Sequence, residues 1–143
     1  MQKLEVVIDT NVLLSALRSS QGKSYKLIFE KLFNGEFIMA LSAPVVLEYE
    51  EILKDRLPPH LFSNEEIDEF IDALVEISHK HLIYFLWRPF LKDNEDDHIL
   101  ELALSAKVKY IITFNVRDFS NTDMLGIYPI TPQQFLQILE EEV

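Results

Sequence analysis

Four acidic side chains stand where a predicted strand ends or where a helix begins beside such an end. They are Asp9, Glu48, Asp97 and Asp118. The clearest case is Asp9. It follows a strand-like segment whose branched apolar residues, Leu4, Val6, Val7 and Ile8, predict a buried strand. Burying an isolated carboxylate is costly, so we expect Asp9 at the mouth of this strand, where open α/β sheets bind their ligands.

Oxygen donors gathered at one edge of a sheet would suit a hard divalent cation. Parallel strands bring their carboxyl ends to the same edge, so the four acids can converge there. The sequence contains no cysteine, so no thiolate site is possible and Mg²⁺ or Mn²⁺ fits best. Such an ion stabilises charge on a phosphoryl centre and activates water near neutral pH, which predicts metal-dependent phosphodiester hydrolysis.

Each acid also has a purely structural interpretation. A carboxylate after a strand is commonly a turn residue or a helix cap, and for Asp9 alone this interpretation has roughly even weight. Glu48 stands beside Glu50 and Glu51, and alone it would be assigned to a solvated helix face. Asp118 could merely shape a loop. The four positions together are more informative than any one of them.

Strand and helix patterns alternate along the chain and predict a single domain over residues 1–143. The expected strands are residues 4–8, 37–41, 82–86, 110–113 and 126–130. The expected helices begin near Val12, Tyr25, Ser42, Ser63, Asn94 and Thr131. Ser63 is followed three residues later by Glu66, which predicts a capping box. This alternation predicts a mainly parallel sheet of four to five strands with helices on both sides.

The composition is strongly acidic, with 24 Asp and Glu against 13 Lys and Arg and a net charge of −11. This excess argues against a broad nucleic-acid-binding surface. It does not exclude a nuclease, because a cage of carboxylates is acidic until a metal neutralises it. The lack of cysteine suits a reducing compartment, and neither a signal peptide nor a membrane-spanning run is present. We therefore expect a cytoplasmic protein without membrane contact.

The histidines and one aromatic cluster carry less information. His79 and His81 form a His-x-His pair at the predicted end of a helix, and no third ligand lies nearby in the sequence. We interpret the pair as a solvated helix terminus. His98 follows Asp97 and could approach the site, although a surface position is the default expectation. The aromatic residues within 84–90 predict part of the core or a contact between subunits.

Several segments, in this order and at this spacing, resemble the PIN-domain ribonucleases. They are VVIDTNVLLSAL, APVVLEYEEIL, DNEDDHILELAL, YIITFNVRDF and ITPQQFL, and together they cover nearly the whole chain. DTNV alone would be a weak signal, whereas the ordered set is specific. The resemblance is closest to the branch described as toxin components of bacterial and archaeal toxin–antitoxin pairs.

The resemblance implies a Rossmann-like α/β/α sandwich of three layers and one acidic site that depends on Mg²⁺ or Mn²⁺ and cleaves single-stranded RNA. Water activated by the metal would attack phosphorus in line and leave 5′-phosphate and 3′-hydroxyl ends. The positions that match the family's acids are Asp9, Glu48 and Asp97, with Asp118 matching a recurrent acid of a loop. The family often has an acid where Asn115 stands, and asparagine lowers the charge of the site.

Further residues are expected to support this site. Those that would assist the acids or orient ligands are Thr10, Asn11, Asp96, Thr113 and Asn115. The basic residues nearest the first motif, able to contact RNA phosphates, are Arg18, Lys23 and Lys26; ordinary solvated side chains are an equally weighted interpretation. The resemblance also implies an antitoxin protein as a partner and a homodimer of this chain.

Other enzymes that place an Asp after a strand fit less well. Chemistry of the haloacid dehalogenase type needs a second Asp where Asn11 stands, and a receiver domain needs an acidic pair near the first strand and a Lys after the last. A dinucleotide-binding module needs a glycine-rich turn, but Gly22 is the first glycine of only 3. The remaining alternative is a PIN fold that acts as a binding or scaffold module with weak or lost nuclease activity. Asn115 and the net charge favour it.

Overall fold

In the part of the chain that the structure describes, five parallel strands form the central sheet, in the spatial order β3–β2–β1–β4–β5. The structure is a computed structural model that describes residues 3–83 and 94–141, without the side chains of residues 94–96. The strands are β1 (Glu5–Ile8), β2 (Ile38–Leu41), β3 (His79–Lys80), β4 (Tyr110–Ile112) and β5 (Tyr128–Ile130). The predicted parallel sheet is therefore confirmed, with the larger of the two expected strand numbers.

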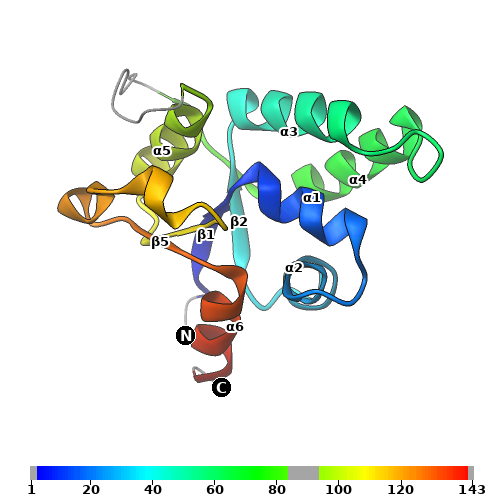
Figure 1. Ribbon diagram of the computed structural model, residues 1–143. Helices are drawn as coiled ribbons and strands as arrows, with labels where there is room; N and C mark the ends of the chain where they lie inside the picture. Colours follow the sequence, from blue (N-terminus) through cyan, green and yellow to red (C-terminus); the bar gives the residue numbers. More distant parts are fainter. Residues whose placement is uncertain (1–2, 84–93, 142–143) are drawn as a thin grey trace.

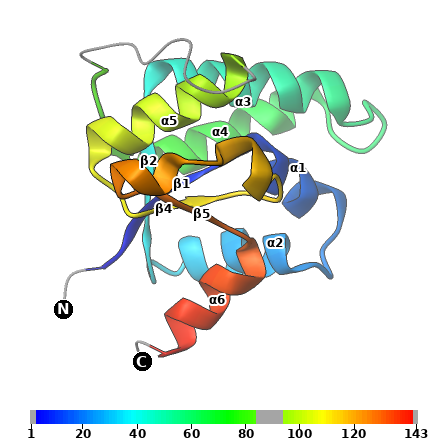
Figure 2. The same ribbon diagram turned by 60° about the vertical axis from the view of Figure 1, so that its left-hand side comes forward.

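Helices cover both faces of the sheet and make the three-layer α/β/α sandwich that the sequence predicted. They are α1 (Thr10–Arg18), α2 (Lys23–Tyr25), η1 (Lys26–Leu32), α3 (Ala43–Arg56), α4 (Asn64–Ile77), α5 (Asn94–Ala106), η2 (Val116–Phe119), η3 (Thr122–Leu125) and α6 (Pro132–Glu141) (Figure 1). Figure 2 shows α3, α4 and α5 above the strands and α2 and α6 below them. Within the described ranges, no helix is long and apolar enough to cross a membrane.

The central strand β1 is buried on both faces, as its apolar sequence predicts. Val6, Val7 and Ile8 are each 0% exposed, which a strand between two helical layers requires. From β1 the chain builds β2 and β3 on one side, and then crosses to add β4 and β5 on the other. The carboxyl ends of β1 and β4 therefore flank the topological switch point, where open α/β sheets bind ligands.

Local signals in the sequence fix the starts of the helices that follow these strands. The Ser42 side chain accepts a hydrogen bond from the Val45 amide at the start of α3. Ser63 and Glu66 form the predicted capping box of α4, with both reciprocal hydrogen bonds present. Each cap involves residues only three apart, so the starts of α3 and α4 are determined by the local sequence.

The third strand does not lie where the apolar pattern predicted it. The prediction was residues 82–86, whereas β3 is His79–Lys80, paired with Ala40 and Leu41 of β2. Residues 82–83 are not in a strand, and Leu82 is 72% exposed. The prediction was wrong because an edge strand with two exposed polar residues carries no hydrophobic signal. The rest of that prediction, and the aromatic contact expected within 84–90, lie outside the described residues.

Candidate active site at the carboxyl edge of the sheet

Asp9 lies at the end of β1 and occupies the N-cap position of α1. Its side chain makes no capping hydrogen bond to that helix, and the residue is only 6% exposed. A buried carboxylate at this position could have satisfied the amides of the helix, but the Asp9 side chain does not. The interpretation of Asp9 as a simple helix cap is thereby excluded.

The Asp9 carboxylate is held from the neighbouring strand. The hydroxyl Oγ1 of Thr113 donates to Asp9 Oδ2 at 2.7 Å, and Thr113 is fully buried. The Asn115 backbone amide donates to the same Thr113 oxygen at 2.9 Å, so the hydroxyl hydrogen is left to point at Asp9. The Asp9 amide donates to the Ile112 carbonyl at 2.9 Å. The backbone and side chain of Asp9 are therefore both fixed across the switch point.

A buried tyrosine supports the same strand end from α3. The Tyr49 hydroxyl donates to the backbone carbonyl of Ile8, the residue before Asp9. Burial raises the pKa of Tyr49 well above its ordinary value, and the negative charges of Asp9 and Glu48 raise it further. Tyr49 thus stays protonated as a donor, and its surroundings carry negative potential from two of the predicted acids.

Glu48 and Asp97 lie on two helices, α3 and α5, that pack against each other. The Glu48 carboxylate on α3 contacts Nδ1 of His98 on α5, which joins the helix of Glu48 to the first turns of α5. Asp97, beside His98, is fully buried. Because α5 leads into the parallel strand β4, its start lies towards the carboxyl edge, where Asp9 stands. The sequence favoured a surface position for His98 and left open an approach to the site; in the structure it contacts the predicted site residue Glu48.

Glu101 is a buried acid that the sequence analysis did not single out. It is 2% exposed and lies four residues after Asp97 on α5, hence on the same face of the helix. In the sequence it looks like an ordinary charged residue of an amphipathic helix. Its spacing from Asp97 was the one available signal, since residues four apart share a face. We add Glu101 to the candidate acids.

The fourth predicted acid differs in its surroundings. Asp118 lies on η2 and is exposed, and its backbone amide donates to the Asn115 carbonyl at 2.9 Å. Asn115 is also exposed and contributes to the site through the amide that donates to Thr113. Asp96 lies on α5, and its side chain lies outside the described residues. The Asn115 amide is therefore linked to Asp9 through the Thr113 hydroxyl.

The remaining predicted residues lie along α1 and at the start of α2 and η1. Thr10 is buried and Asn11 is half-buried in the first turn of α1, next to Asp9. Arg18 ends α1, about 12 Å further along the helix axis, and its guanidinium donates to the Arg56 carbonyl at 3.3 Å. Lys23 is exposed and Lys26 half-buried beyond it. Arg18 thus stands a helix length from Asp9.

The donor set at this edge suits a hard divalent cation. Asp9, Glu48 and Asp97 offer carboxylate oxygens, and the sequence contains no cysteine to offer a thiolate. Oxygen ligands of this kind favour Mg²⁺ or Mn²⁺ over softer metals. The negative charge that raises the pKa of Tyr49 is also what a bound cation would offset. The residues present therefore fit the ion that the sequence predicted.

Comparison with known proteins identifies the family. The PIN domain family model matches residues 5–117, which include Asp9, Glu48, Asp97 and Thr113. A comparison with curated proteins gave no significant match. Among solved structures, VapBC2 from Rickettsia felis, bound to a DNA fragment from the promoter, has a similar fold with a TM-score of 0.62. The sequence identity is 13%, and the match covers 90% of this chain and 98% of that one. PIN domains are generally metal-dependent nucleases, and this chain belongs to the PIN domain family.

Proposed function

We propose that this PIN domain is an endoribonuclease that depends on Mg²⁺ or Mn²⁺ and cleaves single-stranded RNA. The observation that carries the proposal is the Asp9 carboxylate, held by the Thr113 hydroxyl at the switch point of the sheet. Buried acids on adjoining elements and the motif resemblance to PIN-domain ribonucleases support it. The −11 net charge makes tight binding of duplex without a metal unfavourable.

In this proposal the four predicted acids bind the metal, and two further residues orient them. Asp9, Asp97 and Glu48 would hold the cation, and Asp118 would join them from η2. When bound, such an ion neutralises charge that builds on the phosphate and makes water a better nucleophile. Thr113 keeps the Asp9 carboxylate in one orientation, while His98 does the same for Glu48. Both contacts reduce the rearrangement that ligand binding would otherwise require.

An exposed aromatic side chain beside the site supports a single-stranded substrate. Phe114 is 48% exposed and follows Thr113, the residue that holds Asp9. Every base has a face that can stack on such a ring, provided that the base is not already in a duplex. We expect Phe114→Leu to raise KM for single-stranded RNA with a smaller effect on kcat.

The test is a cleavage assay on one purified single-stranded RNA with Mn²⁺. Asp9→Asn and Asp97→Asn keep the size of the side chain and remove its charge, so both should lose activity. Asp72→Asn is the matched control, because Asp72 is an exposed acid on α4, a helix that carries none of the predicted site residues. Cleavage by Asp9→Asn at the wild-type rate would refute the site. A folded wild type that binds RNA without cutting it would instead indicate a scaffold.

The proposal extends to a cytoplasmic toxin role with an antitoxin partner, supported by the motif resemblance to the toxin branch. Induced expression of the wild type in a bacterial host should arrest growth, while Asp9→Asn should not. Co-expression of a small protein encoded by the adjacent gene should restore growth. Unimpaired growth of cells that contain active wild-type enzyme would indicate a free-standing nuclease and not a toxin. Light scattering on the purified chain tests the expected homodimer.

A further inference from the structure

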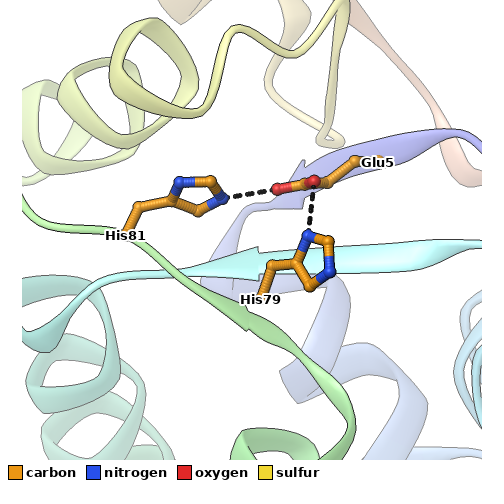
Figure 3. Close-up of side chains that lie close together, drawn as sticks. All are labelled: Glu5, His79 and His81. Atoms are coloured by element: carbon orange, nitrogen blue, oxygen red, sulfur yellow. Dashed lines mark hydrogen bonds and ion pairs between the residues drawn. The ribbon is translucent and has the colours of Figure 1, made fainter.

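A second cluster of metal-ligating side chains lies on the sheet, away from Asp9. It consists of Glu5, His79 and His81, whose ligand atoms all lie within 4.8 Å of one another. Glu5 Oε1 is 2.9 Å from Nδ1 of His79, and Glu5 Oε2 is 2.6 Å from Nε2 of His81. Figure 3 shows both imidazole rings directed at the two oxygens of the one carboxylate.

The register of the strands explains why these three residues meet. His79 and His81 are two residues apart across β3, so their side chains leave the same face of the sheet. His79 pairs with Ala40 of β2, and Glu5 pairs with Ile38 two residues earlier on that strand. The side chain of Ala40 is a single methyl group, which allows the Glu5 carboxylate to reach across β2.

Two imidazoles and one carboxylate are a known donor set for a transition metal. In a tetrahedral site with bonds of about 2.0–2.1 Å, neighbouring ligand atoms stand about 3.4 Å apart. The two contacts to Glu5, 2.9 and 2.6 Å long, would lengthen by about 0.5 and 0.8 Å to reach that spacing. Imidazole nitrogen selects Zn²⁺, Cu²⁺ and Ni²⁺ over Mg²⁺ or Ca²⁺. The cluster is therefore distinct in chemistry from the oxygen site at Asp9.

The cluster is also open enough for an ion to enter. The side chains of Glu5 and His81 are 20% and 24% exposed, and that of His79 is 60% exposed. Three protein ligands leave a fourth tetrahedral position for water or another ligand. Asp9 lies four residues after Glu5, about 13 Å further along the strand direction. One ion therefore could not serve both sites.

We infer that Glu5, His79 and His81 form a second metal site that binds a divalent transition metal, with Zn²⁺ as the representative ion. The ion would tie the edge strand β3 to the central strand β1 across β2. Of the strands that the structure describes, β3 is the shortest, with two residues, and it lies at an edge of the sheet. A bound ion therefore stabilises the native sheet, and the inference does not depend on the nuclease proposal.

The test uses Zn²⁺ alone, followed by calorimetry and thermal unfolding of the full chain. We use the Asp9→Asn background so that the carboxyl-edge site does not contribute. We expect one Zn²⁺ per chain, and at about one hundred times Kd a rise in Tm of about 5 to 10 °C. Mg²⁺ at the same concentration should give no such rise at this cluster.

His79→Gln and His81→Gln identify the ligands. Glutamine can still donate a hydrogen bond to Glu5, so the fold should persist, and circular dichroism checks this directly. Each substitution should weaken Zn²⁺ binding by more than the ~10–100-fold typical of losing an outer-shell partner. His60→Gln, at an exposed loop histidine, is the matched control and should bind as the background does. Unchanged binding in His81→Gln, or no binding by the folded background protein, would overturn the site.

Discussion

The Thr113 hydroxyl offers the sharpest perturbation of the active site that leaves every proposed ligand in place. Thr113→Val has nearly the same shape and is accommodated in the same fully buried position. It removes the 2.7 Å hydrogen bond to Asp9 Oδ2 and the acceptor of the Asn115 amide. The Asp9 carboxylate would keep its charge but lose the contact that sets its orientation.

The size of the effect follows from the kind of hydrogen bond that is lost. A bond to a charged group contributes about 1.5–3 kcal/mol. If that contribution is realised in the transition state, kcat/KM falls by about 10- to 150-fold, since ~1.4 kcal/mol is tenfold in rate. The free energy of unfolding should fall by about 1–3 kcal/mol, because a buried polar contact is lost. Thr113→Ser keeps the hydroxyl and should retain most of the activity.

The assay compares cleavage of one single-stranded RNA by wild type, Thr113→Val and Thr113→Ser across a Mn²⁺ titration. We expect Thr113→Val to need more Mn²⁺ for half-maximal activity, which a change in stability alone would not produce. Urea unfolding confirms that each variant is folded under assay conditions. Wild-type kinetics in Thr113→Val would refute a positioning role, as would equal losses in the valine and serine variants.

Further predictions concern the strand end, a helix start and the metal. Tyr49→Phe removes the donor to the Ile8 carbonyl and should lower the free energy of unfolding by about 1–3 kcal/mol in urea. Burial, and to a smaller extent the charges of Asp9 and Glu48, raise the pKa of Tyr49 in the folded protein. As the pH rises, the Tyr49 hydroxyl therefore loses its proton in the unfolded chain before it does so in the folded one. Wild-type stability should therefore fall as pH rises above 10.0, and Tyr49→Phe should lack this part of the fall. Ser63→Ala breaks the capping box of α4 and should cost about 0.5–2 kcal/mol in the same unfolding measurement. Chelation with EDTA should abolish RNA cleavage, and added Mn²⁺ should restore it in a gel-based assay.

The sequence was sufficient for the features that local chemistry determines. The β-branched run before Asp9 predicted the central strand because burial on both faces leaves only apolar residues. Ser63 and Glu66 predicted the start of α4 because a capping box involves only residues three apart. The link between Asp9 and Thr113 lay beyond such reasoning, since it spans 104 residues and depends on strand order.

The features that the sequence did not reveal depend on partners distant in the chain or on burial without an apolar signal. His79 and His81 were interpreted as a solvated terminus because Glu5 is 74 residues from His79 and reaches it across β2. Glu101 is charged yet buried, so hydrophobic periodicity assigns it to the solvent side of α5. Arg18 follows the DTN motif closely in sequence, but the length of α1 separates the two in space.

The ends of the RNA products provide the most direct measurement of the proposed chemistry. Wild type with Mn²⁺ should produce fragments with 5′-phosphate and 3′-hydroxyl ends, because water displaces the 3′-oxygen from phosphorus. Asp9→Asn, assayed at the same concentration, should yield no such fragments, while Asp72→Asn should yield the wild-type pattern. Cyclic 2′,3′-phosphate ends would contradict attack by water, and identical products from Asp9→Asn would contradict the site at the carboxyl edge.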